Sequence, residues 1–250
     1  MDDAELCEHV VGALAAIDSV LAVALGGSRA TGTHRPDSDW DFGVYYRGRL
    51  DTGAIRAVGW EGQVFEPGEW GGGVFNGGAW LDIDGRRVDL IYRDLDDVER
   101  RWAEARAGTF AIERLPFHLA GIPTYVVVGE LALGRVVHGR LPRPRYPAAL
   151  SRGAAGRWHG EAAYSFDFGR RAYAERGEVA GAVGSLAKAL MEEGHSRLAA
   201  RREWVLNEKR LIERAGLAPA AALLGRVGTS PAALRRAYDR LEEVILGPGG

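Results

Sequence analysis

Residues 20–46 read VLAVALGGSRATGTHRPDSDWDFGVYY and carry the strongest structural signals of the sequence. This stretch begins with a fully apolar run, residues 20–25, that ends in Gly26-Gly27, a pattern typical of a buried strand entering a tight turn. Its last eight residues, 39–46, predict a second strand. The sequence therefore predicts two strands, with a glycine turn directly after the first.

Polar groups capable of chemistry follow the first strand and begin the second. Backbone N–H groups at the turn, with the Ser28 hydroxyl, can hold a phosphate at the positive end of a helix that begins there. Asp39 and Asp41 lie two residues apart on the second strand, so both side chains leave the same face. Two carboxylates on one face repel each other unless a divalent cation lies between them. The stretch therefore predicts a phosphate site and a metal site.

A third carboxylate lies in a predicted hairpin. Residues 80–83 and 86–92 flank Asp84-Gly85, which is the pattern strand, two-residue turn, strand. Asp89 interrupts the apolar part of the second strand. Asp89 alone is compatible with the solvent face of an ordinary strand. Together with the Asp pair and the phosphate turn, it is better explained as part of the same site.

The other predicted elements of the first half are helices and one loop. The stretch over 68–78 is rich in glycine, and it is either a flexible surface loop or a lid over a ligand. Helices are expected over residues 4–18, 95–107 and 129–139.

A proline-rich stretch marks the expected domain boundary. Residues 141–147 contain three prolines and interrupt any helix or strand, so we treat them as a linker. The predicted domains are a mixed α/β domain over 1–140 and an all-helical domain over 148–250, an α+β chain overall. Ser230-Pro231 predicts the start of one of the later helices.

Charge and cysteine usage limit the functional class. Residues 1–140 carry a net charge of −8 and residues 141–250 a net charge of +6, which suggests two domains facing a polyanion and its metal ions, or else chance clustering on solvated faces. The sequence pI of 6.3 disfavours a nucleic-acid binder, since duplex-binding domains usually exceed about 9. Cys7 is the only cysteine, and no run approaches the roughly 18 apolar residues of a membrane span. The N-terminus begins acidic and lacks the basic region of a secretory signal, so we expect a cytoplasmic protein without membrane contact.

These motifs resemble a known superfamily. Gly27-Ser28, ten intervening residues, Asp39-x-Asp41 and a later acid on a neighbouring strand are similar to the nucleotidyltransferases typified by DNA polymerase beta. A short first domain followed by a helical one resembles the aminoglycoside and lincosamide nucleotidyltransferases within it. The resemblance is specific over residues 20–45, good over 86–92, and only architectural beyond 147.

The resemblance implies a mechanism and its catalytic residues. Asp39 and Asp41 would hold two Mg²⁺ ions and Asp89 would ligate the catalytic one, while an NTP, by family habit ATP, donates its nucleoside monophosphate. Asp89 is one candidate for the general base. Some relatives use a separate glutamate, for which Glu61, Glu66 and Glu69 are the reachable candidates.

Candidate nucleotide ligands come from both halves of the chain. In the first half they are Gly27, Ser28 and Arg29, which form the turn. Lys188 and Lys209 are the only two lysines in a chain rich in arginine. A lysine retained in such a chain can mark a position that requires a compact ammonium and not a planar guanidinium, as a phosphate site can. Lys209 lies in a segment similar to a helical segment of the antibiotic-modifying relatives, whose lysine contacts the phosphates. Both lysines are alternatively surface charges or ion-pair partners of Glu192, Glu193 or Glu208.

The resulting functional hypothesis is an Mg²⁺-dependent nucleotidyltransferase that moves AMP from ATP to a hydroxyl of a small molecule and releases pyrophosphate. An antibiotic is one candidate acceptor, and the enzyme is expected as a monomer or homodimer. The alternatives are a protein-modifying enzyme, as in toxin–antitoxin systems, and a nucleotide-binding module without catalysis.

Overall fold

The computed structural model describes residues 1–247 and divides into two compact units. Unit 1 comprises Met1–Ala103 and Thr124–Arg145, and unit 2 comprises Glu104–Pro123 and Tyr146–Gly250. Residues 104–123 therefore group with the helical part of the chain. A single boundary at the proline-rich stretch would instead place these residues in the first domain. The ranges 1–140 and 148–250 stay a prediction for the functional domains.

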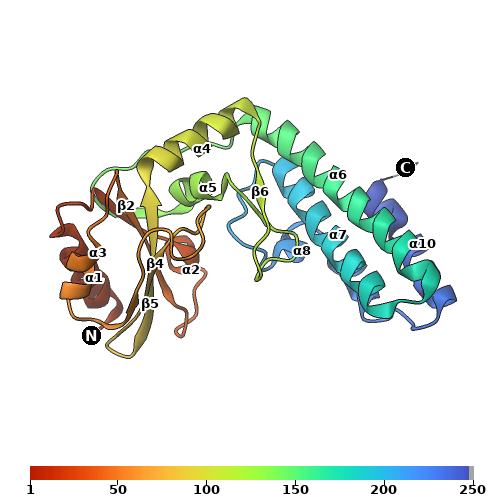
Figure 1. Ribbon diagram of the computed structural model, residues 1–250, viewed down its shortest axis with the longest axis horizontal. Helices are drawn as coiled ribbons and strands as arrows, with labels where there is room; N and C mark the ends of the chain where they lie inside the picture. Colours follow the sequence, from red (N-terminus) through yellow and green to blue (C-terminus); the bar gives the residue numbers. More distant parts are fainter. Residues whose placement is uncertain (248–250) are drawn as a thin grey trace. The chain divides into compact units, whose positions relative to one another are not determined.

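Unit 1 is built on a six-stranded mixed sheet with strand order β3-β4-β5-β2-β1-β8 (Figure 1). The one parallel pair in the order is β2–β5, and the other neighbours run antiparallel. The strands are β1 (Ala22–Leu25), β2 (Trp40–Tyr46), β3 (Glu61–Val64), β4 (Gly78–Ile83), β5 (Arg86–Asp94) and β8 (Arg135–His138). The helices of this part of the chain are α1 (Asp3–Ala15), α2 (Gly27–Thr31), α3 (Thr52–Ala57), α4 (Leu95–Ala107) and α5 (Val126–Leu133).

Local sequence signals account for these elements. Asp2 caps α1 through a capping box with Glu5, and the apolar face of α1 is fully buried at Leu6, Val10 and Leu14. The hairpin turn has φ values of 56° at Asp84 and 71° at Gly85, as a two-residue turn with left-handed positions requires. The predicted mixed α/β domain and its hairpin are confirmed.

One predicted helix of unit 1 is wrong in its second half. Residues 129–139 were expected to form a single helix, but α5 ends at Leu133 and residues 135–138 form β8, the edge strand beside β1. Gly134 closes α5 with an extended backbone, ψ 154°. The strand has only four residues, too few for its β period to be recognised.

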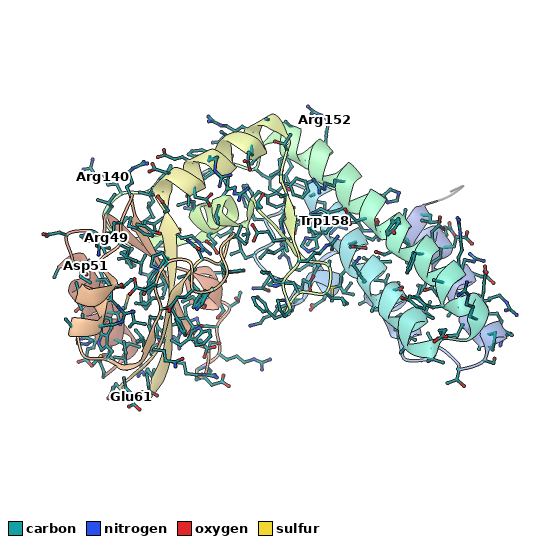
Figure 2. The ribbon with its side chains drawn as sticks, viewed as in Figure 1. Arg49, Asp51, Glu61, Arg140, Arg152 and Trp158 are labelled. Carbon is teal, nitrogen blue, oxygen red and sulfur yellow. The ribbon has the colours of Figure 1, made fainter. Side chains whose placement is uncertain are left out.

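Unit 2 is helical, with three long helices side by side: α6 (Ala148–Ala172), α7 (Val179–Ala200) and α10 (Pro231–Leu246) (Figure 1). Ser230 Oγ accepts a hydrogen bond from Ala233 N at 3.2 Å, so the predicted N-cap is confirmed. Trp158 on α6 is fully buried (Figure 2). The smaller elements are η1 (Ala174–Arg176), α8 (Leu211–Arg214), α9 (Ala218–Leu224) and the paired strands β6 (Ile112–Glu113) and β7 (Ile122–Pro123).

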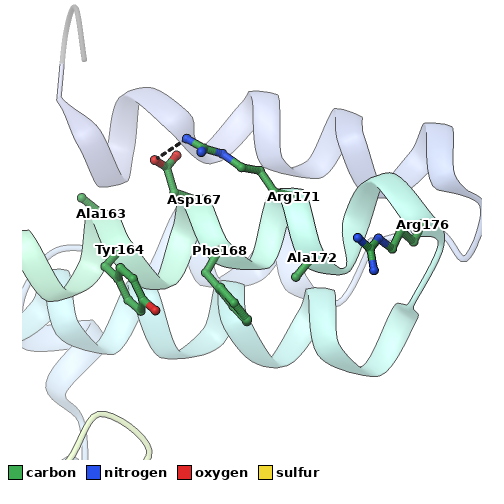
Figure 3. A pocket seen from close by; sticks show the side chains of 7 residues that line it. All are labelled: Ala163, Tyr164, Asp167, Phe168, Arg171, Ala172 and Arg176. Carbon is green, nitrogen blue, oxygen red and sulfur yellow. Dashed lines mark hydrogen bonds and ion pairs between the residues drawn. The ribbon is translucent and has the colours of Figure 1, made fainter.

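The outer face of α6 carries an exposed aromatic pair. Tyr164 and Phe168 stack with ring centroids 6.1 Å apart, and Arg171 forms an ion pair with Asp167 beside them (Figure 3). These side chains border a shallow pocket. Within residues 1–247, no helix has the length and apolar composition needed to cross a membrane.

Candidate functional site

Two of the predicted carboxylates stand side by side on the sheet of unit 1. Asp41 on β2 pairs in register with Asp89 on β5, and paired residues of neighbouring strands present their side chains on the same face. Both residues are half-buried. The alternate residues of the same two strands, Phe42 and Leu90, are fully buried in the core behind them. The sheet therefore brings these two carboxylates together on an accessible face over a rigid apolar layer.

The glycine turn lies directly against Asp41. Gly26 N donates to Asp41 O at 2.7 Å, and a Cβ at Gly27 would overlap Asp41 Oδ2. Gly27 also has φ 58°, a left-handed backbone that glycine adopts at low cost. The absence of a side chain at Gly27 is what lets the Asp41 carboxylate approach the turn. The predicted phosphate turn and the predicted metal ligand are thus neighbours.

Ser28 and Arg29 lie in the short helix α2, which begins at Gly27 and ends in the left-handed Gly32. Ser28 is half-buried. Arg29 donates to Ser38 O from Nε (3.2 Å) and Nη2 (2.9 Å), and its guanidinium lies 4.1 Å from the Trp40 ring centroid. Its Nη1 also donates to Asp3 Oδ2 at 2.8 Å. These contacts hold the loop that precedes β2, and binding phosphate would require Arg29 to exchange some of them.

Asp39 precedes β2 and is engaged by a cation. Arg87 Nε lies 2.7 Å from Asp39 Oδ1, an ion pair whose angles fall outside hydrogen-bond geometry. Across residues 1–247, no group of three or more His, Cys, Asp or Glu side chains is arranged to hold a metal ion. Asp41 and Asp89 nevertheless fit a divalent cation, because carboxylate oxygens are its preferred ligands. The missing side chain at Gly27 leaves room for the Asp41 carboxylate beside the turn. Asp39 would join the two carboxylates by exchanging Arg87 for the ion.

Two of the three candidate glutamates, Glu66 and Glu69, are engaged in hydrogen bonds outside the carboxylate pair. Glu66 accepts hydrogen bonds from Thr52 Oγ1 (2.7 Å) and Arg56 Nη1 (2.6 Å), and these bonds lower its pKa. Glu69 Oε2 accepts from Glu66 N at 2.6 Å, and Glu61 lies on β3 opposite Asp82. Asp89 is therefore the carboxylate best placed beside Asp41 to accept a proton.

A buried ion pair fixes the glycine-rich stretch to the sheet. Arg93 on β5 is 3% exposed and binds Glu130 of α5 through Nε (2.6 Å) and Nη2 (2.7 Å). Its Nη1 donates to Val74 O at 2.6 Å. Trp70 of the same stretch packs against Phe65 and Trp80. The stretch is therefore anchored at two points, Trp70 and Val74, on either side of three consecutive glycines with positive φ.

Trp80 lies in the same row as the carboxylates, although no sequence motif marks it. Trp80 on β4 is directly opposite Asp89 in the antiparallel pair β4–β5. Its side chain is therefore on the face that carries Asp89 and Asp41, and it is 52% exposed. The register was available from the sequence, because a two-residue turn at Asp84-Gly85 places residue 80 opposite residue 89.

The two predicted lysine ligands belong to unit 2. Lys188 Nζ donates to Ser165 Oγ at 3.0 Å and lies 3.1 Å from Oε1 of the fully buried Glu192. Lys209 is exposed and lies between α7 and α8 in a non-helical segment, which corrects the helical setting expected for it. Lys188 thus forms an ion pair with Glu192, as its alternative interpretation predicts. Of the two lysines, Lys209 is the more accessible to solvent.

Comparison with known proteins identifies the domain that carries the carboxylates. Residues 7–106 match the family model described as a nucleotidyltransferase domain. This range contains the glycine turn and the three predicted carboxylates, Asp39, Asp41 and Asp89.

Among solved structures, the chain is similar to a nucleotidyltransferase-like protein from Exiguobacterium sibiricum 255-15, with 14% identity, 98% of this chain and 77% of that chain covered, and a TM-score of 0.45. No curated protein matches the sequence significantly. From the family match, the chain contains a polymerase beta-like nucleotidyltransferase domain over residues 7–106, and its enzyme class is nucleotidyltransferase.

Proposed function

We propose that the enzyme transfers the nucleoside monophosphate of an NTP, with ATP as the favoured donor, to a hydroxyl group of a small molecule. The single observation that carries this proposal is the pairing of Asp41 with Asp89 beside the side-chain-free turn at Gly27. Carboxylates next to a phosphate-sized turn suit a reaction in which a triphosphate and its counter-ions must be held together.

Each residue of this face has a role in the proposal. The N–H groups of the Gly27–Ser28 turn and the Ser28 hydroxyl bind the leaving phosphates. Asp39, Asp41 and Asp89 would hold divalent cations, and these supply Lewis-acid stabilisation of the phosphate charges and a lower pKa of the attacking hydroxyl. Lys188 and Lys209 are proposed as further phosphate ligands. Arg29 is proposed as a phosphate ligand only if it exchanges its contact with Ser38.

The proposed reaction balances without any other reagent. The acceptor oxygen forms a bond to the α-phosphorus, and the bond from that phosphorus to the bridging oxygen breaks, which releases pyrophosphate. The hydroxyl proton passes to a base, for which Asp89 is our candidate because it lies in register with Asp41. We further propose a cytoplasmic enzyme that acts as a monomer or homodimer. An antibiotic is one acceptor compatible with this chemistry, and a protein side chain is the alternative acceptor.

The test compares Asp41→Asn with a matched control, Asp37→Asn. Asp37 is an exposed carboxylate of the loop just before β2 and is not part of the proposed site. Calorimetry with a non-hydrolysable ATP analogue, with and without Mg²⁺, measures donor binding, and pyrophosphate release with ATP measures turnover. We expect Asp41→Asn to lose at least about 10³-fold in turnover, equivalent to about 4 kcal/mol of transition-state stabilisation. The control should match the wild type in both assays.

Two results would contradict the proposal. Absence of metal-dependent binding of either an ATP or a GTP analogue by the wild type would remove the donor. Equal turnover in Asp41→Asn and Asp37→Asn would place the reaction elsewhere. An enzyme should lose turnover in Asp41→Asn, whereas a nucleotide-binding module without catalysis would show binding and no pyrophosphate release even in the wild type.

A further inference from the structure

A row of residues crosses the accessible face of the sheet from the glycine turn to an exposed indole. Gly26 and Gly27 contact Asp41 on β2, Asp41 pairs with Asp89 on β5, and Asp89 pairs with Trp80 on β4. Neighbouring strands are about 4.8 Å apart, so Trp80 lies about 5 Å from Asp89 along this row, and Asp41 about one strand further. The carboxylates thus have the phosphate turn on one side and Trp80 on the other.

The indole of Trp80 is held in place from behind. Trp70 stacks on it with ring centroids 5.5 Å apart and an interplanar angle of 23°, and Phe65 meets it edge-on at 4.8 Å and 73°. Gly78 allows this packing, since a Cβ there would lie 2.5 Å from Trp70 Cη2. Trp80 nevertheless remains 52% exposed. The result is an exposed aromatic surface whose orientation is fixed by two other rings, next to Asp89.

The geometry of phosphoryl transfer decides which substrate meets this surface. In an in-line displacement, the attacking oxygen and the leaving oxygen are on opposite sides of the reacting phosphorus. If the leaving phosphates occupy the turn at Gly27–Ser28, the acceptor must approach from the opposite side of the Asp41–Asp89 pair. That side is the β4 side, where Trp80 lies. The exposed indole therefore lies on the side from which an acceptor would approach, away from the turn at Gly27–Ser28.

We propose that Trp80, supported by Trp70, stacks on a ring of the acceptor, so that the acceptor is a hydroxylated ring compound. This inference rests on the proposed function and names the substrate class of the same site. Aromatic side chains bind ligands through large apolar contact, and a stacked ring accepts either the C–H face of a sugar or another aromatic ring. Trp80 is then a specificity-determining residue that orients the acceptor hydroxyl toward Asp89. A flexible acceptor without a ring would gain nothing from it.

The test uses the full chain and phenyl β-glucopyranoside, a probe that carries both a sugar ring and an aromatic ring. Calorimetry with Mg²⁺ and a non-hydrolysable ATP analogue is performed first. Saturation-transfer NMR with the analogue bound then measures the affinity of the probe and shows which of its protons touch the protein. We expect Trp80→Ala to weaken probe binding at least tenfold and to leave the analogue affinity within twofold. Trp80→Phe should retain most of the binding.

Two further variants separate a binding role from a folding role. Tyr164→Ala removes a comparably exposed aromatic side chain from unit 2 and should change neither affinity. Trp80→Leu keeps apolar packing against Trp70 and Phe65 but offers no ring. It should fold and still lose the probe, so that a Trp80→Ala variant that fails to fold does not end the test.

The outcomes distinguish the two levels of the proposal. Saturation on the sugar protons indicates a sugar-like acceptor, and saturation on the phenyl protons an aromatic one; both support a ring on Trp80. Equal probe affinity in wild type and Trp80→Leu, or no probe binding by the analogue-bound wild type, overturns the acceptor subsite. A tenfold loss of analogue affinity in Trp80→Leu overturns it as well, because the indole would then bind the nucleobase. Failure of the wild type to bind the analogue, seen before any probe is added, contradicts the proposed function itself and with it the subsite.

Discussion

The two units place their charged residues in opposite ways. In unit 1, Asp41 and Asp89 are half-buried on an accessible sheet face, and the core behind them is apolar. In unit 2, α7 carries Glu192, Glu193 and His195 into the interior, where they are 0%, 7% and 1% exposed. The first arrangement leaves carboxylates available to ligands, and the second encloses ionisable groups among packed helices.

This contrast indicates which variants should change the chemistry of the protein and which should change its stability. A half-buried carboxylate on an accessible face keeps part of its hydration, so its replacement by an amide of similar size costs the fold less than the loss of a fully buried charge. A buried charge depends on its partners because water cannot replace them. Glu193, for example, is bound by Arg197 Nε at 2.8 Å and approached by His159 Nδ1 at 3.2 Å. Three predictions test this contrast.

The largest effect is expected from Lys188→Met, which removes the ion-pair partner at 3.1 Å from the fully buried Glu192. Breaking a buried pair leaves an uncompensated charge, and the lower end of the usual cost, about 3 kcal/mol, applies because Arg114 Nη1 remains 3.6 Å from the same oxygen. Urea unfolding measures the free energy. Adding Glu192→Gln to this variant should recover much of the loss.

Urea unfolding together with calorimetry of ATP-analogue binding addresses the proposed role of Lys188 as a phosphate ligand. Lys209→Met serves as the comparison, because Lys209 is exposed and its loss should leave the stability unchanged. If Lys188→Met were as stable as the wild type, the contrast between the two units would be wrong at this position. A loss of ATP-analogue affinity in Lys209→Met would support the phosphate role of that residue.

A smaller effect concerns pH. Burial, with the nearby charges of His118 and Arg214, lowers the pKa of His195 to about 3, and its ring stacks on Trp158 at 4.3 Å. The pKa is lower in the folded than in the unfolded chain, so the stabilisation is present above the unfolded value and is lost as the pH falls. Between pH 7 and pH 5, one such histidine should cost about 2 kcal/mol of stability. His195→Phe should keep the stacking and remove this part of the pH dependence, measured by urea unfolding at both pH values.

The smallest effect sharpens the description of unit 1. Gly27→Ala would bring a methyl group into Asp41 and impose a left-handed backbone on alanine, whereas Gly32→Ala imposes only the latter, since nothing lies within 4 Å of a Cβ there. Gly32→Ala should lose about 1 kcal/mol of stability, and Gly27→Ala should lose more because the Asp41 side chain must also move aside. Gly27→Ala alone should lose about tenfold in ATP-analogue affinity, which is about 1.4 kcal/mol. Equal affinities in the two variants would show that the approach of Asp41 to the turn does not matter.

Much of unit 1 could be predicted from the sequence because its signals are local. The glycine turn, the Asp39-x-Asp41 pattern and the hairpin turn each specify backbone geometry within a few residues. The family resemblance then supplied the enzyme class, which the family match over residues 7–106 confirms.

What the sequence did not reveal depends on contacts between distant residues. The strand β8 is only four residues long and forms because β1 offers it an edge. Glu192 is a charged residue of the kind usually found on the solvated face of a helix. Only the packing of α6 against α7 shows that it is buried. The contacts of Arg29 with Asp3 and Ser38 likewise join segments that no local pattern connects.

The path of the chain between the units has a consequence for synthesis on the ribosome. Unit 1 is interrupted by residues 104–123, and its edge strand β8 follows only at residues 135–138. The interrupting segment in turn relies on Glu208, whose carboxylate accepts hydrogen bonds from Leu119 N and Ala120 N at 2.7 and 2.6 Å. A nascent chain that stops at the proline-rich stretch would therefore contain all six strands of the sheet, whereas Leu119 N and Ala120 N would still lack Glu208. Residues translated after that stretch complete the hydrogen bonds of a segment made well before them, so residues 104–123 finish folding only once residue 208 has been made.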